Sequence, residues 1–305
     1  MRGRSPRPIV NVMTHSGSGP NARRDAGGGE WRSWSESDAR ADIRPPVPGD
    51  DKYTRGVVGV MTGSAMYPGA AVLGVEAAAR TGAGMVRYLG PERAADLVLQ
   101  RRPEVVTADG RVQAWVLGSG MDAASRSAAA TDELLRALGQ GVPAVVDAGA
   151  LDLVDRAAGP VVITPHYREL ATVLAAAGED VTAEEIAADA AGWAERAAEL
   201  LGVTVLLKGH TTHVVGPDVR IRVLAGPAWL ASAGSGDVLA GVLGALAAAS
   251  ADRIAADPSA LANVAASAAL VHGRAGARAS AGGPLVALDI AGAVPAVIAD
   301  LLGAP

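Results

Sequence analysis

The strongest constraint on the fold is an alternation between two kinds of segment that begins after Lys52. Short runs rich in Val, Ile and Leu are separated by longer stretches rich in Ala, a pattern typical of consecutive βαβ units. Strands are expected over residues 56–61, 85–89, 114–117, 144–146, 161–164, 203–207 and 212–215, and helices over 70–80, 125–138, 183–201 and 260–277. We therefore expect an α/β fold in which helices cover both faces of a largely parallel sheet.

The composition limits the kind of protein this is. The chain has 305 residues, half of them hydrophobic, which is enough for the core of one full-sized α/β domain. Cysteine is absent, so disulfides and thiolate metal sites are excluded, and a cytoplasmic location is expected. A net charge of -5 without a basic cluster in the domain disfavours nucleic-acid binding. The longest uncharged runs, such as residues 238–251, are shorter than the roughly 18 residues of a membrane span.

The first 48 residues differ in composition from the rest of the chain. They are rich in Gly, Ser, Pro, Arg and Asp and poor in aliphatic side chains. Such a segment has too little apolar surface to offset the entropy lost on ordering, and it contains no apolar stretch long enough for a signal peptide. We expect a disordered leader over residues 1–48 and a single domain over residues 49–305.

A small-residue segment, Gly234-Ser235-Gly236-Asp237, precedes an apolar helical stretch. Glycines at these positions let several backbone N–H groups converge on a phosphate at a helix N-terminus. Asp237 then lies in the first turn, either as a general base or as a residue that merely caps the helix. The third glycine of a dinucleotide-binding turn is missing, because Leu239 occupies its position.

Further polar motifs follow the expected strands. The strand over residues 114–117 leads into Gly118-Ser119-Gly120, and Asp147 follows residues 144–146. Thr164-Pro165-His166 and Lys208-Gly209 each follow a further strand. Since chemistry in such sheets gathers at the carboxyl ends of the strands, these residues are candidates for one site. Turn formation could explain the glycines and Pro165, helix capping could explain Asp147, and a solvated charge could explain Lys208.

His166 and Glu169 are three residues apart, so they would share one face of a helical turn. Two such ligands without an identifiable third disfavour a transition-metal site. Mg²⁺ held together with diphosphate oxygens fits this pair better.

Eight motifs, in this order, resemble the ribokinase-like superfamily and, within it, the ADP-dependent NAD(P)H-hydrate dehydratases. The resemblance covers roughly residues 50 to 303. The motifs are KYTRG (52–56), TGSAMYPGAA (62–71), TGAGMV (81–86), LGSG (117–120), VDAGAL (146–151), ITPH (163–166), LKG (207–209) and GSGD (234–237). The resemblance implies a three-layer αβα ribokinase-like fold with a largely parallel central sheet.

The resemblance also implies an activity and a set of site residues. The reaction is the ADP-dependent dehydration of the S-form of hydrated NADH or NADPH (NADHX or NADPHX), with ADP as phosphoryl donor and Mg²⁺ as cofactor. Asp237 would be the catalytic base, and Glu169 would hold Mg²⁺ through water. Substrate would contact Gly69, Ala70, Gly120, His166 and Asp237. The nucleotide would contact Lys208, Gly209, His210, Thr211, Thr212, Gly234, Ser235 and Gly236.

The chain departs from the family pattern in two places. Tyr167 and Arg168 replace the usual Pro-Gly between His166 and Glu169, which puts the path of that loop in doubt. Trp229 and Ala233 stand where small or glycine residues are usual, and we favour a packing role for Trp229 over a cover for the substrate.

Two other kinds of function remain open. An ATP-dependent small-molecule kinase of the same superfamily, acting on a hydroxymethyl-pyrimidine, a thiazole alcohol or a sugar, would use the same cradle and base. A non-catalytic nucleotide sensor would need a damaged base or cradle, but Asp237 and both glycines are intact. The resemblance further implies a homo-oligomer, with a tetramer as one arrangement, and partners limited to small molecules.

Overall fold

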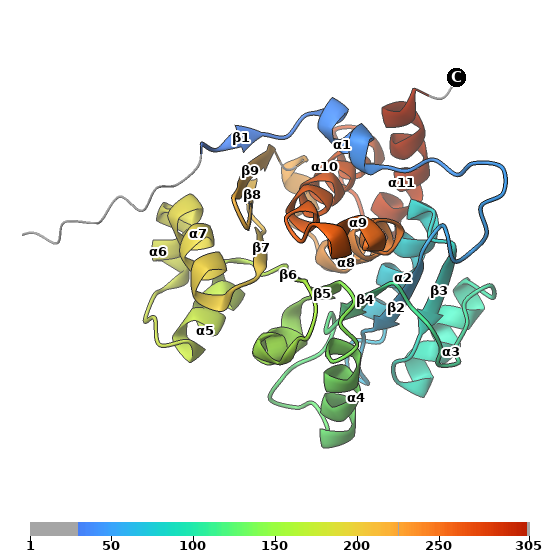
Figure 1. Ribbon diagram of the computed structural model, residues 1–305, viewed down its shortest axis with the longest axis horizontal. Coiled ribbons are helices and arrows are strands. Elements are labelled where there is room, and N and C mark those ends of the chain that lie inside the picture. Colours follow the sequence, from blue (N-terminus) through green and yellow to red (C-terminus); the bar gives the residue numbers. More distant parts are fainter. Residues whose placement is uncertain (1–29, 225, 304–305) are drawn as a thin grey trace, which may run out of the picture.

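The computed structural model describes residues 30–224 and 226–303. Within these residues nine strands form one sheet in the order β1-β9-β8-β7-β6-β5-β4-β2-β3, and helices cover both of its faces (Figure 1). The strands are β1 (Arg32–Ser33), β2 (Val57–Met61), β3 (Met85–Tyr88), β4 (Ala114–Leu117), β5 (Ala144–Val146), β6 (Val161–Ile163), β7 (Thr204–Leu207), β8 (Thr211–Gly216) and β9 (Val219–Leu224). Strands β2 to β7 pair in parallel, and β8 runs antiparallel to both β7 and β9. The expected three-layer α/β fold is confirmed.

Three of the four helices expected from the sequence, over residues 70–80, 125–138 and 260–277, are present with small shifts at their ends. The described helices are α1 (Glu36–Asp42), α2 (Gly69–Thr81), α3 (Glu92–Arg101), α4 (Ala128–Leu138), α5 (Tyr167–Ala176), α6 (Ala183–Ala188), α7 (Ala190–Leu201), α8 (Ser235–Ala249), α9 (Ala251–Ala256), α10 (Ala260–Ser280) and α11 (Ala287–Leu302), with 3₁₀ turns η1 (Ala148–Arg156) and η2 (Ala228–Leu230). The expectation of one helix over residues 183–201 is wrong. Asp189 interrupts it, because its carboxylate accepts a hydrogen bond from the Gly192 backbone N–H at 3.0 Å and starts a new helix.

The sheet separates two hydrophobic cores. Neighbouring residues of one strand point to opposite faces, so in β4 Val116 packs into one core while Trp115 and Leu117 pack into the other. Helices α2, α8, α10 and α11 cover the first face, and α4, α5 and α7 cover the second (Figure 1). Beyond Asp237, helix α8 is apolar all round and mostly buried, and Gly244 lets it lie directly on Val116 of the sheet. None of the described helices has the length and apolar character needed to cross a membrane.

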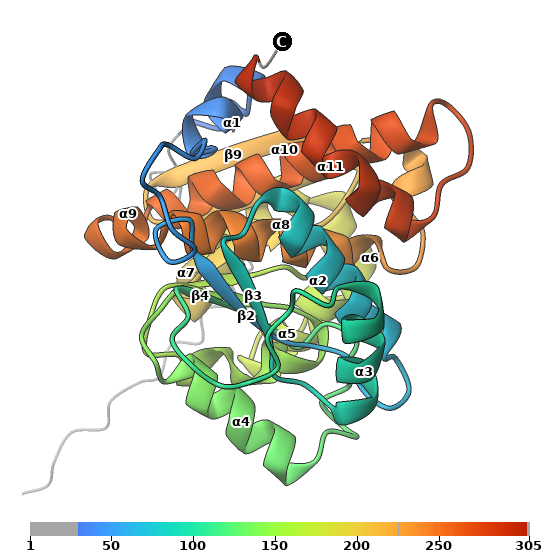
Figure 2. The same cartoon turned by 90° about the vertical axis from the view of Figure 1, so that its right-hand side faces the viewer.

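The expectation of a disordered leader through residue 48 is wrong for residues 30–48. Strand β1 pairs with β9 (Figure 1), and α1 packs against α10 and α11 (Figure 2). Trp34 is buried and its Nε1 donates to Ser267 Oγ at 3.0 Å, while Asp42 accepts from Ser267 at 2.7 Å and from Arg253 at 2.5 Å. A few well-placed side chains therefore order this segment although its mean composition is polar. Residues 1–29 lie outside the described part of the chain.

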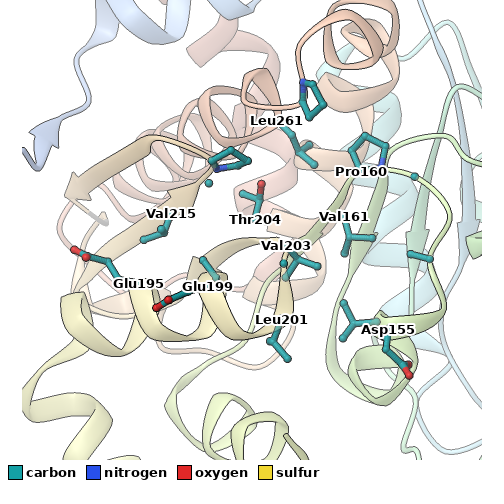
Figure 3. A pocket seen from close by; sticks show the side chains of 18 of the residues that line it. Asp155, Pro160, Val161, Glu195, Glu199, Leu201, Val203, Thr204, Val215 and Leu261 are labelled. Carbon is teal, nitrogen blue, oxygen red and sulfur yellow. The ribbon is translucent and has the colours of Figure 1, made fainter. Parts of the chain in front are cut away.

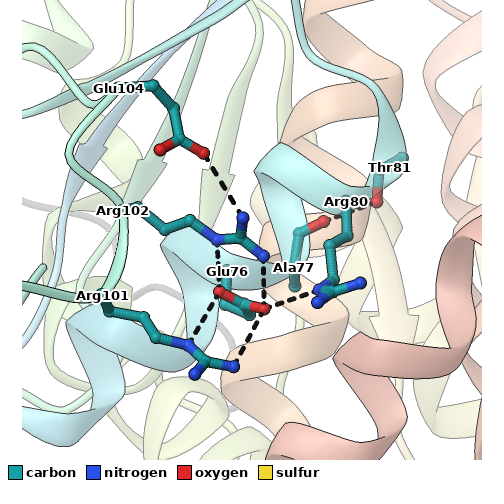
Figure 4. Close-up of polar contacts among 7 residues, drawn as sticks. All are labelled: Glu76, Ala77, Arg80, Thr81, Arg101, Arg102 and Glu104. Carbon is teal, nitrogen blue, oxygen red and sulfur yellow. Dashed lines mark hydrogen bonds and ion pairs between the residues drawn. The ribbon is translucent and has the colours of Figure 1, made fainter.

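A buried carboxylate ties α2 to α3. The Glu76 side chain is fully buried and faces Arg80, Arg101 and Arg102 (Figure 4), with the shortest contact, 2.5 Å, to Arg102 Nε. Burial alone would raise the pKa of Glu76, but the hydrogen bonds from the three guanidinium groups outweigh burial and lower the pKa to about 2. Glu76 is therefore ionised at neutral pH, and its pairs with Arg101 and Arg102 join the C-terminal end of α3 to α2.

Candidate active site

A cavity of about 740 Å³ lies at the carboxyl ends of β5, β6 and β7, beside the N-terminus of α8. Most of the site residues expected from the sequence line this cavity together. They are Asp147, His166, Glu169, Lys208, Gly209, His210, Thr212, Gly234, Ser235, Gly236 and Asp237. Four other expected site residues, Gly69, Ala70, Gly120 and Thr211, are not part of this lining.

The glycines of the cradle have a structural reason. Gly234 is the N-cap of α8 and has φ +88°, and a Cβ there would lie 2.5 Å from Leu73 Cδ1. Only glycine fits this left-handed backbone without strain. The N-cap makes no side-chain hydrogen bond. The Ser235 N–H donates to the Ser232 carbonyl oxygen at 3.3 Å, which leaves the N–H groups of Gly236 and Asp237 for an anion at the helix N-terminus. Gly236 lies next to Lys208, since a Cβ on Gly236 would be 3.5 Å from Lys208 Nζ.

Asp237 is the third residue of α8, and the N-cap position belongs to Gly234. The structure therefore does not use Asp237 as the N-cap residue. Burial, reinforced by the negative charge of Asp147, raises the pKa of Asp237 to about 6, although the Lys208 cation acts in the opposite direction. A carboxylate with such a pKa is still mostly ionised at neutral pH, and it is a stronger base than an ordinary aspartate.

Asp147 is the centre of a buried hydrogen-bond network. Ser119 Oγ donates to Asp147 Oδ2 at 2.9 Å, and Thr164 Oγ1 donates to Oδ1 at 2.7 Å. Lys208 Nζ donates to the same Oδ1 at 3.0 Å. Asp147 makes no side-chain capping bond to η1, so the capping interpretation of this residue is wrong. No sequence pattern indicates that Ser119 and Thr164 share this partner, because they follow different strands.

Lys208 is held between carboxylates. Besides its bond to Asp147, its Nζ lies 3.7 Å from Glu169 Oε2. Burial alone would lower the pKa of Lys208, but the charges of Asp147 and Glu169 outweigh burial and raise the pKa. Lys208 is therefore a fixed cation inside the cavity rather than the solvated surface charge that the sequence left open.

His166 and Glu169 do lie close together, but as the two partners of a helix cap rather than as two side chains on one face of a helical turn. His166 is the N-cap of α5, and the two residues form a capping box. The His166 backbone N–H donates to Glu169 Oε2 at 2.8 Å, and the Glu169 N–H donates to His166 Nδ1 at 3.1 Å. Tyr167 and Arg168 are accommodated in the first turn of α5, where the Tyr167 hydroxyl packs against Gly209.

The donors around the cavity fit a hard cation better than a transition metal. Across residues 30–224 and 226–303, no group of three or more His, Asp or Glu side chains is placed to hold a metal ion. The carboxylates of Asp147 and Glu169 do line the cavity. Mg²⁺ commonly takes one or two carboxylates and completes its coordination with phosphate oxygens and water, so these residues fit a magnesium nucleotide.

The structure gives different outcomes for the two departures at Trp229 and Ala233. Trp229 is 48% exposed and does not line the cavity, so the packing role expected for it is wrong. Ala233 does not have a positive φ, and its methyl group is accommodated just before the cradle.

His272, which no sequence motif marks as a site residue, also lines the cavity. His272, in the middle of α10, contacts Ser235 at the first position of α8. A lone histidine inside an Ala-rich helix has no local signal that distinguishes it from a core residue.

A second cavity, of about 440 Å³, lies at the opposite, amino ends of β6 and β7 (Figure 3). Its carboxylate Glu195 already accepts a bond from Trp31 Nε1 at 2.8 Å and pairs with Arg220 at 3.2 Å. None of the expected site residues lines it. The first cavity is therefore the candidate active site.

Comparison with known proteins agrees with this assignment. A family model described as NAD(P)H-hydrate dehydratase matches residues 58–290. The chain belongs to this family. The bifunctional NAD(P)H-hydrate repair enzyme Nnr of Mycobacterium tuberculosis is 45% identical over 218 residues, which are 67% of this chain and 43% of that protein. The chain thus matches less than half the length of such relatives.

A single-function relative and a solved structure extend the comparison. The ADP-dependent (S)-NAD(P)H-hydrate dehydratase of Neisseria meningitidis is 34% identical over 213 residues, which are 64% of this chain and 70% of that protein. The ADP/ATP-dependent NAD(P)H-hydrate dehydratase of Bacillus subtilis, co-crystallised with ATP/Mg²⁺, superposes with a TM-score of 0.76 at 25% identity, over 89% of this chain and 99% of that one. A hydroxyethylthiazole kinase from Pyrococcus horikoshii shares the fold at a TM-score of 0.60 and 15% identity, over 88% of this chain and 96% of that one.

Proposed function

We propose that this chain is a hydro-lyase that dehydrates the S-form of NADHX or NADPHX with ADP as the phosphoryl donor, and so restores NADH or NADPH. The observation that carries the proposal is one cavity in which the α8 cradle, the Lys208 cation and the Asp237 carboxylate with its raised pKa meet. Family membership supports this reaction over other reactions that such a cavity could perform.

The chemical problem is the leaving group. Hydroxide leaves poorly at neutral pH, whereas phosphate leaves readily. Asp237 accepts the proton of the ring hydroxyl while that oxygen attacks the terminal phosphorus of ADP, which releases AMP. The ring C–O bond of this phosphate ester then breaks, phosphate departs with the bonding electrons, and loss of a proton from the adjacent ring carbon restores the double bond. One turnover yields the reduced cofactor, AMP and inorganic phosphate.

The other residues of the cavity bind and neutralise charge. The N–H groups of Gly236 and Asp237 in the first α8 turn, together with Lys208, would bind the phosphates, which gain negative charge as the phosphoryl group moves. Bound Mg²⁺ would add further charge neutralisation, held by water and phosphate next to Glu169 and Asp147. The hydrated ring would approach from the side of His166, while Gly69, Ala70 and Gly120 would contact more distant parts of the dinucleotide. Gly120 packs directly against Ala70, so these residues form one surface.

The test uses NADHX with ADP and Mg²⁺ and follows the return of reduced-nicotinamide absorbance. Asp237→Asn keeps the size of the side chain but cannot accept a proton, so it should lower kcat by about 10²–10⁴ while ADP still binds. Asp252→Asn is the matched control, because Asp252 is also a first-turn carboxylate but is exposed on α9. Near-normal turnover by Asp237→Asn would remove the base assignment.

The same preparation separates the proposal from the kinase alternative. If the wild-type chain restores no absorbance with ADP or ATP but phosphorylates a small alcohol with ATP, the dehydratase proposal is overturned. The expected homo-oligomer is measured on the same sample by light scattering, and it remains a prediction.

A further inference from the structure

A buried hydrogen-bonded pair lies beneath the phosphate cradle. His272 belongs to α10 and Ser235 is the first residue of α8, and His272 Nε2 lies 3.1 Å from Ser235 Oγ. The two residues are only 8% and 6% exposed, respectively, and both line the cavity. The reaction proposed above uses the backbone of Ser235 and leaves His272 without a role.

The imidazole of His272 is neutral at physiological pH. Burial lowers the pKa of His272 to about 4, although a hydrogen bond with the Ser235 backbone acts in the opposite direction. The Lys208 cation also acts to lower it. A neutral imidazole has one nitrogen that donates and one that accepts, so it can pair with a hydroxyl group in either direction without placing an unpaired charge in the core.

The position of this pair matters because the neighbouring residues cannot fix the turn. Gly234 and Gly236 flank Ser235, and neither has a side chain that could anchor the backbone. The N-cap makes no side-chain hydrogen bond. The contact between Ser235 and His272 thus connects the first turn of α8 to α10, which packs against the sheet.

We propose that His272 is a positioning residue for nucleotide binding, which holds the α8 cradle in its phosphate-binding geometry through its hydrogen bond to Ser235. This inference rests on the proposed use of the cradle for ADP. His272 does not touch the phosphates in this arrangement. It acts by restricting a turn in which two glycines favour no single backbone conformation, and so it lowers the entropy lost when the phosphates are bound.

Two amide substitutions test the inference because they differ in reach. The side-chain amide of His272→Gln extends to the position of Nε2, whereas that of His272→Asn extends only to the position of Nδ1. His272→Asn should raise the Kd for ADP about threefold to tenfold, as expected for the loss of one neutral hydrogen bond. His272→Gln should stay within about twofold of the wild type, because it restores the contact. Calorimetry with ADP and Mg²⁺ gives these constants, and the melting temperature shows that each variant is folded.

A double-mutant cycle with Ser235→Ala tests whether His272 affects ADP binding through its hydrogen bond to Ser235. In the Ser235→Ala background, His272→Asn should not weaken ADP binding further, because the hydrogen bond is already absent. His213→Leu is the control, since His213 is a half-buried histidine on β8 that does not line the cavity. It should leave the Kd for ADP unchanged.

Several results would overturn the inference. These are additive effects in the cycle, equal weakening by Asn and Gln, or the same weakening in His213→Leu. ADP binding does not require turnover, so the two proposals can fail separately. If the double-mutant cycle gives the expected Kd values but the wild-type protein does not dehydrate NADHX, only the proposed function is overturned. A wild-type chain that binds neither ADP nor ATP would overturn both.

Discussion

The raised pKa of Asp237 predicts how the activity depends on pH. A base must be ionised to act, so kcat/KM should fall as the pH decreases through the pKa of this carboxyl in the free enzyme. That pKa is about 6, raised from an ordinary value of 3.8 first by burial and then by the charge of Asp147. Asp147→Asn removes that charge and should therefore move the acidic limb of the profile to lower pH.

The expected size of the effect is large at pH 5. With a pKa of about 6, about one tenth of the Asp237 carboxyl is ionised at that pH, so kcat/KM should be about one tenth of its plateau. An aspartate with an unperturbed pKa near 3.9 would retain about nine tenths of the plateau. In Asp147→Asn the limb should shift towards lower pH without reaching the ordinary value, because burial, the larger cause, remains.

The assay is the initial rate of NADHX dehydration between pH 5 and 8 at low substrate concentration. The terminal phosphate of ADP itself titrates near pH 6, at about the same value as other phosphate monoesters, so one profile alone is ambiguous. The comparison between wild type and Asp147→Asn removes this contribution, since both enzymes use the same nucleotide. Superimposable profiles, or a wild-type profile that is flat down to pH 5, would refute the reasoning.

Three further predictions concern stability and the cradle. Glu76→Gln should lower the free energy of unfolding at pH 7 by up to about 3 kcal/mol, because folding lowers the pKa of Glu76 from 4.5 to about 2 and so stabilises its ionised form. This difference in free energy of unfolding between wild type and Glu76→Gln should shrink as the pH falls below 4.5. Urea unfolding at pH 7 and pH 3.5 measures it, and equal differences at the two pH values would disprove the prediction. Trp34→Ala should cost about 3 kcal/mol in urea unfolding, because a buried indole is lost. The exposed Trp229→Ala should cost little, and an equally small cost in Trp34→Ala would show that Trp34 does not anchor the α1 segment. Gly234→Ala should weaken ADP binding in calorimetry more than Gly178→Ala, because both have a positive φ but only Gly234 also faces Leu73. Equal binding by the two variants would contradict this.

Tertiary contacts corrected the treatment of the N-terminal segment. The composition of residues 1–48 predicts disorder, yet Trp34 and Asp42 dock residues 30–48 against α10. Mean composition cannot register a single indole and a single carboxylate whose partners, Ser267 and Arg253, lie more than 200 residues further along the chain.

The electrostatics of the site also depend on contacts between distant segments. Asp147 could be placed at a strand end from the sequence, but its partners Ser119, Thr164 and Lys208 come from three other strand ends. Parallel pairing of neighbouring strands brings these ends to one edge of the sheet. The raised pKa of Asp237 follows from this assembly, because burial and the Asp147 charge exist only in the folded chain.

The sequence by itself determined the properties that are local or periodic. The alternation of short β-branched runs and Ala-rich stretches specified the parallel sheet and its helical layers, and Gly234 and Gly236 marked the start of α8 with Asp237 in its first turn. Only the tertiary structure decided which side chains meet, such as the pairing of His272 with Ser235. Periodicity records which face of a segment is buried, whereas a hydrogen bond between residues 37 positions apart depends on how two helices cross over the same sheet.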